Sequence, residues 1–443
     1  MRGYPDVVPH PMVDAVFQAL DREGLRWCVL RGEALLERAS GDVDLLVPPI
    51  DLSRLRHAVG ELGFVPVPAW GYGSHRFFMG YDSVRDGWVK LDVVTELAFG
   101  PGFALPTGAE AACLERRRRQ GRLAVLDDED AFWALLLHRL LDKGSVPHDS
   151  VIRLRELAAA AGTGGPLATR VDASCPPAWS AARLLGLARD GDWEALVAFG
   201  PQLAMSWRRH VRAAVWRRAS AAVVGRWAGR LLRLRYRRGL GVAVLAPDGA
   251  GKSMLVQGLR ETFAFPTRTV YMGPYQRLAG RPERALPPGL GLAARVCALW
   301  RRWLEGAYHR SRGRLVVFDR YVTDALLPPR WPLGRLGRAR RWLVGHCVPA
   351  PDLVVVLDAP GAVLHQRKGE QDPGVLEAER RAYRALAQRA QRGVVIDATK
   401  PADQVRREAT AAVWRAYGQR WGRRRTPRSP WLDRDRETDL TKS

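Results

Sequence analysis

The sequence of 443 residues has little lysine, little cysteine and no long apolar run. Lysine occurs only at positions 90, 143, 252, 368, 400 and 442. Arginine therefore supplies nearly all of the positive charge behind the formal net charge of +24, which favours polyanionic ligands or an anionic membrane surface as partners. None of the usual nucleic-acid-binding fingerprints is present, so we expect no specific nucleic-acid partner.

The five cysteines, at positions 28, 113, 175, 297 and 347, are scattered and odd in number, which indicates a reducing compartment. The nine histidines form no His-Glu-x-x-His or similar cluster, so we expect no zinc site. No apolar stretch approaches the roughly 18 residues that a membrane span needs, and the first residues lack the apolar core of a signal peptide. These absences predict a cytoplasmic protein.

The length is sufficient for two or three domains, each with its own core. Mixed strand and helix patterns predict an α+β domain over residues 1–109, and apolar residues at helical spacing predict a helical linker domain over residues 110–238. Alternating strands and helices predict an α/β domain with a doubly wound parallel sheet over residues 239–418. Residues 419–443 are polar and charged, which predicts a disordered basic tail.

Residues 240–257 combine an apolar strand, a glycine-rich turn and the start of a helix. The turn reads Pro247, Asp248, Gly249, Ala250, Gly251, Lys252 and Ser253. Its backbone N–H groups and the positive end of the helix dipole suit a polyphosphate, with Lys252 on the outer phosphates and the Ser253 hydroxyl on Mg²⁺. This is the Walker A pattern with Ala246 in place of the first glycine. It predicts a site for ATP and Mg²⁺. The alternative is a glycine-rich turn in which Gly-Lys-Ser occurs by chance.

Three aspartates mark two expected strands of the first domain. Asp42 and Asp44 open one strand, and because alternate side chains of a strand share a face, both carboxylates project the same way. Neighbouring carboxylates repel each other unless they share a cation, which is the arrangement that two-metal phosphoryl chemistry requires. Asp92 lies in a later apolar strand over residues 88–94.

The turn Gly32-Glu33, the Asp-x-Asp pair and the later Asp92 together resemble the nucleotidyltransferase superfamily over roughly the first hundred residues. The resemblance implies that Asp42, Asp44 and Asp92 bind Mg²⁺ and activate an acceptor hydroxyl. That family has Gly-Ser where this chain has Gly32-Glu33, which removes a hydroxyl from the triphosphate corner and adds a negative charge there. An inactive domain of the same fold and a pair of exposed strand-end aspartates stay open as alternatives.

The helical region ends in an arginine-rich stretch that also contains tryptophans. Its apolar residues recur every four positions, at Trp207, Val211 and Val215 and again at Val223, Trp227 and Leu231. A basic amphipathic helix of this kind can make peripheral contact with an anionic membrane. Packing of the apolar side on neighbouring helices is the simpler interpretation, and we favour it. Further upstream, four acidic residues over 127–130 predict the start of a helix.

A buried strand over residues 315–318 delivers Asp319 and Arg320 at its carboxyl end, where they are well placed to meet the glycine turn. Asp319 can orient Mg²⁺ and its waters, and Arg320 can clamp an acceptor phosphate bidentately. Another buried strand ends at Asp358, and the basic residues 365–372 after it predict a mobile lid.

Residues 240–418 resemble the thymidylate kinase family, because four features occur in the same order as in that family. These are the glycine turn, the Asp-Arg-Tyr at a strand end, the strand ending in Asp358 and the basic lid. The resemblance implies ATP on the turn and a nucleoside monophosphate held by Asp319 and Arg320. It also implies that Lys252 contacts the transferred phosphoryl group and that Asp248 approaches the acceptor sugar.

Members of that family whose turn holds no arginine take one from the lid. The resemblance therefore implies that Arg367 is catalytic, with Lys368 as the next candidate, and that adenine lies near residues 399–401. The family's Arg-Glu-Pro element is missing, since residues 270–276 hold no such triplet. The acceptor is consequently dTMP by default or a related phosphorylated compound.

Three functions follow as hypotheses. The first is a kinase that transfers a phosphoryl group from ATP to a nucleoside monophosphate with Mg²⁺, as a monomer or a homodimer. The second adds nucleotidyl transfer by the N-terminal domain, and the third is a non-catalytic nucleotide-binding module at a membrane surface.

Overall fold

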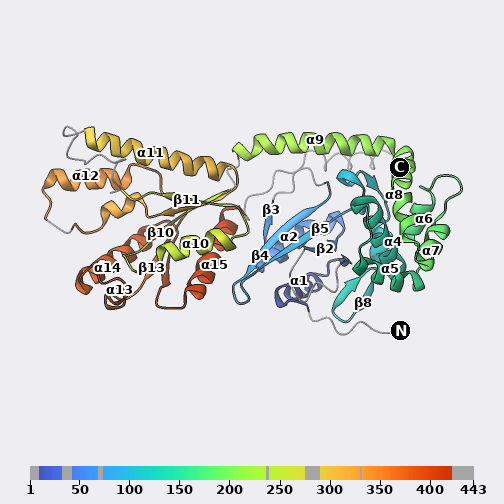
Figure 1. The fold of residues 1–443 in the computed structure, drawn as a ribbon, viewed down its shortest axis with the longest axis horizontal. Coiled ribbons are helices and arrows are strands. Elements are labelled where there is room, and N and C mark those ends of the chain that lie inside the picture. The colour runs from blue at the N-terminus through green and yellow to red at the C-terminus, as the bar shows by residue number, and fades with distance from the viewer. Residues whose placement is uncertain are drawn as a thin grey trace. The chain divides into compact units, whose positions relative to one another are not determined.

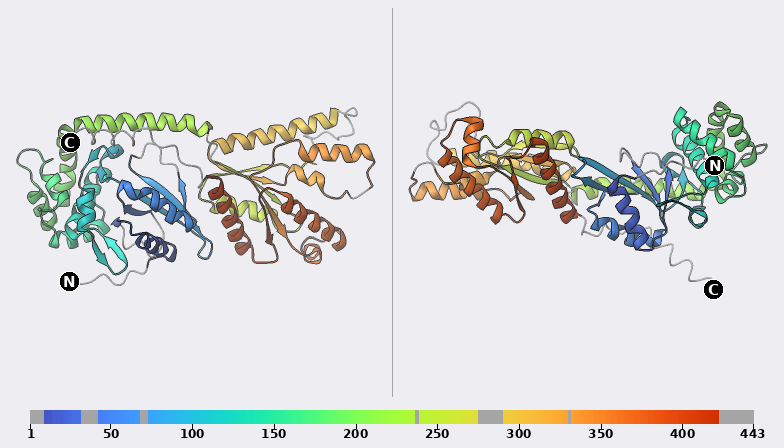
Figure 2. Two further views of the ribbon diagram at one scale, coloured as in Figure 1. Left: turned by 180° about the vertical axis from the view of Figure 1, so that it is seen from behind. Right: turned by 90° about the horizontal axis from the view of Figure 1, so that it is seen from below.

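The computed structural model describes residues 9–31, 42–67, 73–235, 239–274, 290–329 and 332–421, and its elements are shown in Figures 1 and 2. The described residues divide into two compact units. The first holds residues up to 82 and from 87 to 231, and the second holds residues 83–86 and those from 232 onwards. Each unit is described by itself.

A seven-stranded mixed sheet, ordered β3-β4-β5-β2-β1-β9-β8, organises the first unit. Its strands are β1 (Cys28–Arg31), β2 (Asp42–Leu46), β3 (Val65–Val67), β4 (Arg76–Asp82), β5 (Gly87–Val94), β8 (Arg118–Gln120) and β9 (Leu123–Val125). Strand β2 pairs in parallel with β5, and β1 in parallel with β9, while the other pairs are antiparallel. The strands expected around Asp42 and Asp92 are thus present as neighbours.

In the described part of the first unit, nine α-helices and a two-stranded sheet accompany the seven-stranded sheet, together with short 3-10 or π helices at Pro49–Asp51, Pro101–Phe103 and His138–Lys143. The helices are α1 (Pro11–Arg22), α2 (Leu52–Glu61), α3 (Glu110–Arg116), α4 (Asp128–Leu137), α5 (His148–Ala160), α6 (Pro166–Asp172), α7 (Ala181–Asp190), α8 (Trp193–His210) and α9 (Arg212–Arg235), and the small sheet pairs β6 (Ala98–Phe99) with β7 (Leu105–Pro106).

One hydrophobic core runs from the strands of the first unit into its helices. Trp27 stacks on Phe17 of α1 with ring centroids 4.7 Å apart, and the same cluster of buried side chains continues to Trp133 in α4 and Trp207 in α8. Residues 110–238 were expected to form a separate linker domain, but those up to 231 belong to the same unit as the sheet, and their buried side chains share its core. The physical reason is that short amphipathic helices need a second apolar layer, and the sheet supplies it.

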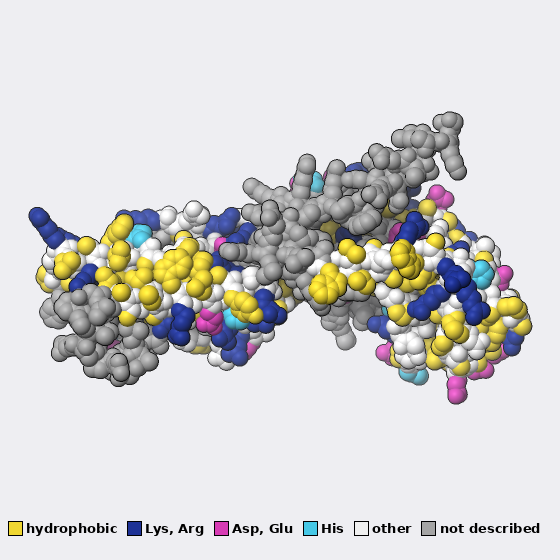
Figure 3. Space-filling view, turned by 90° about the horizontal axis from the view of Figure 1, so that it is seen from above, with side chains coloured by type: hydrophobic (Ala, Val, Ile, Leu, Met, Phe, Trp, Pro, Cys, Tyr) yellow, Lys and Arg dark blue, Asp and Glu magenta, His cyan; other side chains and the backbone are white. Residues whose placement is uncertain are grey.

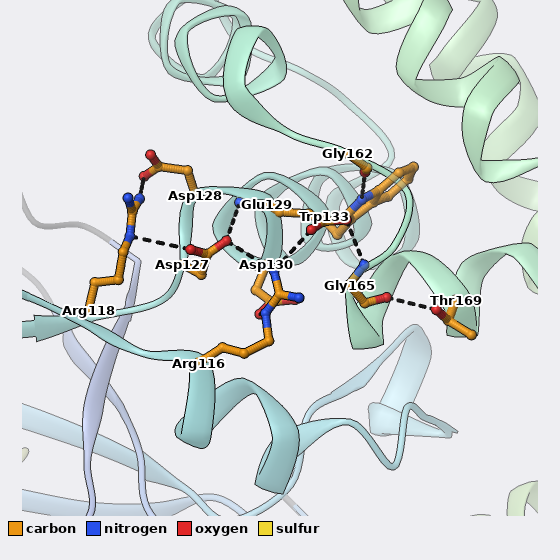
Figure 4. Close-up of polar contacts among 10 residues, drawn as sticks. All are labelled: Arg116, Arg118, Asp127, Asp128, Glu129, Asp130, Trp133, Gly162, Gly165 and Thr169. Carbon is orange, nitrogen blue, oxygen red and sulfur yellow. Dashed lines mark hydrogen bonds and ion pairs between the residues drawn. The ribbon is translucent and has the colours of Figure 1, made fainter. Parts of the chain in front are cut away.

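The acidic helix start expected over residues 127–130 is present as the first turn of α4. Asp127 is the N-cap and accepts a hydrogen bond from the backbone N–H of Glu129. Arg116 reaches three of the carboxylates, at 3.2 Å from Asp127, 2.9 Å from Glu129 and 3.2 Å from the fully buried Asp130 (Figure 4). Glu129 also accepts from the backbone N–H of Gly165, so this cluster joins α3, α4 and α6.

The second unit contains a five-stranded, all-parallel sheet in the order β11-β12-β10-β13-β14. The strands are β10 (Leu240–Leu245), β11 (Thr267–Tyr271), β12 (Leu315–Asp319), β13 (Leu353–Asp358) and β14 (Gly393–Asp397), and the helices are α10 (Lys252–Thr262), α11 (Leu290–Ser311), α12 (Arg335–His346), α13 (Gly361–Lys368), α14 (Pro373–Arg389) and α15 (Ala402–Trp421). The expected α/β class with a parallel sheet is confirmed.

All six residues of β10 are buried, because β12 and β13 flank it and apolar layers cover it. One layer joins Ala243 and Phe318 to residues of α11, α12 and α14, among them Leu299, Val344 and Tyr383.

Helix α15 continues through residues 419–421, which were expected to begin the tail, and the remainder of that expected tail lies outside the described residues. Among the described helices, none is long and apolar enough to cross a membrane.

Candidate functional site

The site lies where the sheet of the second unit changes winding direction. After β10 the chain crosses β12 towards one edge of the sheet and forms β11. After β12 it crosses β10 towards the other edge and forms β13. In parallel sheets, ligands bind at the carboxyl ends of two such neighbouring strands. The glycine turn (residues 246–251) follows β10, and Asp319 and Arg320 end β12, so the two segments expected to meet do so.

The expected strand–turn–helix order over residues 240–257 is present, and two glycines shape the turn. Gly249 and Gly251 both have φ of +86°, a conformation that L side chains rarely adopt. A Cβ at position 249 would also lie 3.0 Å from the carbonyl oxygen of Leu364 in α13. Glycine at 249 is thus required both by the backbone angle and by the close approach of α13.

Lys252 is the first residue of α10, and its ammonium group folds back over the turn. Nζ donates to the carbonyl oxygens of Ala246 and Pro247, both at 2.9 Å, and lies 3.4 Å from Oδ1 of Asp248. Burial, followed by the nearby charge of Arg320, lowers the pKa of Lys252. Oxygen acceptors therefore hold the ammonium group of Lys252 inside the turn, and the oxygens of a phosphate group could replace them.

Arg320 lies between two carboxylates. Its guanidinium donates to Oδ1 of Asp248 at 2.6 Å and to Oδ2 of Asp324 at 3.4 Å. The backbone of Arg320 has φ of +62°, which for a residue with a side chain costs roughly 1–2 kcal/mol. Such a residue persists only where its surroundings fix it, and the two carboxylates do so here.

The pKa values of the two carboxylates beside Arg320 are shifted in opposite directions. Burial acts to raise the pKa of Asp248, but the charges of Lys252 and Arg320 outweigh it, so the pKa of Asp248 lies below its usual range. Asp324 is only 5% exposed, and burial raises its pKa to about 6 even though Arg320 opposes the shift. The hydroxyl of Tyr383, itself buried, also opposes this rise in the pKa of Asp324. The sequence analysis missed Asp324 and Tyr383; only the spacing of four residues between Arg320 and Asp324 could have indicated the former.

Ser253 and Asp319 are the candidates for Mg²⁺. Asp319 ends β12 directly beside Val244 of β10, and Ser253 is the second residue of α10. Oxygen ligands of this kind, together with phosphate oxygens and water, are the ones that Mg²⁺ prefers, so both residues fit the ion. Within the described ranges no group of three or more His, Cys, Asp or Glu side chains could hold a metal ion without such help.

The basic segment expected to be a mobile lid begins inside a helix. Residues 365–368 form the last turn of α13, and only four residues join this helix to α14, whose N-cap is Asp372. Arg367 points away from the turn and donates to the carbonyl oxygen of Ala398 at 2.9 Å. Lys368 is the nearer cation, because its Cβ lies 3.5 Å from a Cβ built at Gly249 and its charge lowers the pKa of Asp248. Successive helical residues point about 100° apart, which is why the two neighbours differ.

The loop expected to receive adenine follows β14. Asp397 accepts hydrogen bonds from the backbone N–H and the hydroxyl of Thr399, at 2.9 and 2.6 Å, and Lys400 pairs with Glu408 at 2.6 Å. Arg367 reaches the carbonyl oxygen of Ala398 in this same loop. Arg367 is therefore connected to the adenine side of the expected site and not to its phosphate side.

In the first unit, the structure brings Asp44 and Asp92 together and gives Asp42 a partner of its own. Asp44 faces Asp92 in the parallel register of β2 and β5, and Asp42 faces Lys90. Lys90 Nζ lies 2.5 Å from Oδ2 of Asp42. The expectation that the carboxylates of Asp42 and Asp44 share a face of β2 agrees with the burial of Val43 between them.

His75 is the residue that the sequence analysis missed in this unit. Its Nδ1 lies 2.8 and 3.0 Å from the two carboxylate oxygens of Asp92, and its ring packs on Phe103 with centroids 4.1 Å apart. No spacing in the sequence predicts this contact, because His75 precedes β4 and Asp92 lies in β5. The turn Gly32-Glu33 lies outside the described residues.

A scan against protein-family models finds no match, and a search of curated proteins finds none either. The function is therefore argued from the geometry of the site alone.

Proposed function

We propose that the second unit transfers a phosphoryl group from ATP, with Mg²⁺, to a nucleoside monophosphate or a related phosphorylated acceptor. One observation carries the proposal: Lys252 from α10 and Arg320, directly after β12, converge on Asp248 in the glycine turn. Two cations on one carboxylate, at the carboxyl ends of neighbouring parallel strands, form a site in which two phosphate groups can be neutralised side by side.

The residues of the chain have separable tasks in this proposal. Backbone N–H groups of the turn and the N-terminus of α10 bind the phosphates of ATP. Lys252 exchanges its carbonyl partners for phosphate oxygens, and Arg320 binds the acceptor phosphate while Asp324 keeps its guanidinium in place. Mg²⁺ bound by Ser253 and Asp319 would neutralise charge on the transferred group. Phosphoryl transfer needs this positioning and neutralisation more than covalent participation by the protein.

The identity of the acceptor depends on the residues beyond Arg320. Tyr271 ends β11 beside Asp319, and Arg302 of α11 lies over its ring at 5.8 Å. This side of the site has an aromatic ring and a cation in the region where the resemblance to thymidylate kinases implies an Arg-Glu-Pro element. We keep dTMP as the first acceptor to test.

The proposal is tested with full-length protein, Mg-ATP and a panel of nucleoside monophosphates. We expect ADP formation that requires an acceptor, that EDTA abolishes and that Lys252→Ala reduces by at least 100-fold. Lys143→Ala is the matched control, because Lys143 is exposed and belongs to the first unit, and it should retain activity. ATP binding without ADP formation on any acceptor would indicate instead a non-catalytic nucleotide-binding module.

A second activity, nucleotidyl transfer by the first unit, is favoured by one observation. Asp44 and Asp92 are direct neighbours on parallel strands, and two adjacent carboxylates attract a divalent cation. Against this, His75 already contacts Asp92, and Lys90 already pairs with Asp42. Pyrophosphate release from nucleoside triphosphates that Asp44→Asn abolishes and Lys252→Ala leaves intact would support the second activity. Its absence would leave the kinase proposal untouched.

A further inference from the structure

Three helices expose tryptophan to solvent, and all three are rich in arginine. Trp216 and Trp227 of α9, Trp300 of α11 and Trp342 of α12 are between 40% and 73% exposed. Tryptophan side chains seldom have exposed fractions this large on several helices, because burial of the large apolar ring is favourable. These exposed faces therefore require an explanation.

On α11 the exposed apolar side chains form a single stripe. Ala293, Cys297, Trp300, Leu304 and Tyr308 are all exposed and recur every three or four residues, which places them on one side of the helix. The opposite side carries Leu299, which is buried in the core of the second unit. Figure 3 looks onto the side of the molecule where α11 lies and shows hydrophobic side chains gathered there, bordered by arginine and lysine. Helix α11 is thus apolar on two sides.

Helix α12 has the same character over a shorter length. Leu336, Trp342 and Leu343 are 69%, 62% and 44% exposed, while Val344 is buried against the core. Four of its twelve residues are arginine and none is acidic. An exposed leucine and tryptophan pair between arginines is the composition of helices that lie in the interfacial region of a bilayer.

The charge of the three helices is almost entirely positive. Helix α9 contains seven arginines and no acidic residue within Arg212–Arg235, and α11 contains four arginines with Glu305 as its single acid. Glu305 is already paired with Arg268 at 2.6 Å. An anionic partner would therefore meet apolar side chains and an excess of positive charge on the same helices.

We infer that α11 and α12 of the second unit bind the surface of an anionic lipid bilayer, with their tryptophan and leucine side chains at the acyl boundary and their arginines at lipid phosphates. A second copy of the chain fits less well, because a two-fold interface pairs each patch with itself and would bring arginine against arginine. A nucleic acid fits less well because Leu304, Leu336 and Leu343 gain nothing from phosphates in water, whereas they gain from burial in lipid. This surface function is independent of the phosphoryl-transfer proposal.

The inference is tested by co-sedimentation of the full-length protein with vesicles of phosphatidylcholine alone and of phosphatidylcholine with 30% phosphatidylglycerol. We expect binding to the anionic vesicles that falls with rising salt. The double variant Trp342→Ser/Leu343→Ser should bind roughly ten-fold more weakly. Ile152→Ser is the matched control: Ile152 is 49% exposed, but it lies on α5, which also carries Asp149 and Glu156, and this variant should bind like wild type.

The arginines are tested separately. Arg338→Gln/Arg340→Gln should lower the partition coefficient by about 30-fold, at about five-fold for each arginine near an anionic surface. Arg381→Gln on α14, also exposed, should not change it. Circular dichroism of each variant confirms that it is folded. Equal binding to both vesicle types, or no binding by folded wild type, overturns the inference. The inference is also overturned if the Trp342→Ser/Leu343→Ser variant binds vesicles like wild type but no longer dimerises, because the partner is then a second copy. The same holds if that variant binds vesicles like wild type but no longer binds RNA, because the partner is then a nucleic acid.

Discussion

Replacing Asp324 by asparagine removes one of the two carboxylates that hold Arg320 without changing the shape of the side chain. Asp324 is 5% exposed and lies 3.4 Å from the guanidinium of Arg320. The substitution therefore perturbs two properties that can be measured independently: the pH dependence of stability and the position of Arg320.

The effect on stability follows from the pKa of Asp324, which burial raises from 3.8 to about 6. The folded protein then holds this proton more tightly than the unfolded chain does, so the associated stability is complete below pH 4 and is lost as the pH rises to about 6. A shift of this size corresponds to about 3 kcal/mol. Asparagine cannot ionise. The free energy of unfolding of the variant should consequently match wild type near pH 4 and exceed it by up to about 3 kcal/mol at pH 8.

The effect on activity has the opposite sign. Without Asp324, Arg320 retains only Asp248, so its guanidinium loses a fixed position in front of the acceptor. We expect kcat/KM for the acceptor to fall between 10- and 100-fold, with KM for ATP unchanged. Urea unfolding at several pH values and steady-state kinetics on the same preparation measure both quantities.

Asp130 provides the control for this reasoning. It is fully buried at the start of α4 in the other unit, and burial raises its pKa to about 6 as well. Asp130→Asn should show the same gain in stability at pH 8 and no change in kinetics. If Asp324→Asn unfolds in parallel with wild type from pH 4 to 8, or if both variants lose acceptor turnover equally, the account of Asp324 is wrong.

Two further pairs of variants test the glycine turn and the residues at the end of α13. Gly249→Ala should weaken ATP binding by at least ten-fold, since φ of +86° and the nearby carbonyl of Leu364 both oppose a side chain, while Gly291→Ala, with open space around it, should bind normally in the same calorimetric titration. Lys368→Ala should lower kcat by at least ten-fold, whereas Arg367→Ala should mainly raise KM for ATP. The reverse result would restore Arg367 as the residue on the transferred group.

Local patterns were sufficient to predict the elements that carry the site. Strand alternation predicted the shared face of Asp42 and Asp44, and the apolar runs before Asp319 and after Gly239 predicted two buried strands. Such features depend on neighbours in the sequence, which is why a single sequence contains them. The turn between β10 and α10 was predictable for the same reason.

Pairings between distant residues were not predictable. Trp207 and Trp216 both occur in the same arginine-rich stretch, yet the first is fully buried and the second is 73% exposed, although its neighbour Val215 packs against the same core. Likewise, His75 meets Asp92 only because β4 and β5 pair. The choice between Arg367 and Lys368 depends on where α13 rests against the turn. Each of these facts comes from tertiary packing, which local propensity does not contain.

The most direct test of the proposed function is transfer of the γ-phosphoryl group itself. Full-length protein is incubated with γ-labelled ATP, Mg²⁺ and dTMP or another nucleoside monophosphate, and the acceptor is isolated and counted for wild type, Lys252→Ala and the control Lys143→Ala. We predict label on the acceptor for wild type and Lys143→Ala and at least a 100-fold loss for Lys252→Ala. Label that never reaches any acceptor, or that reaches it equally in Lys252→Ala, would contradict the assignment of the turn after β10 as a phosphoryl-transfer site.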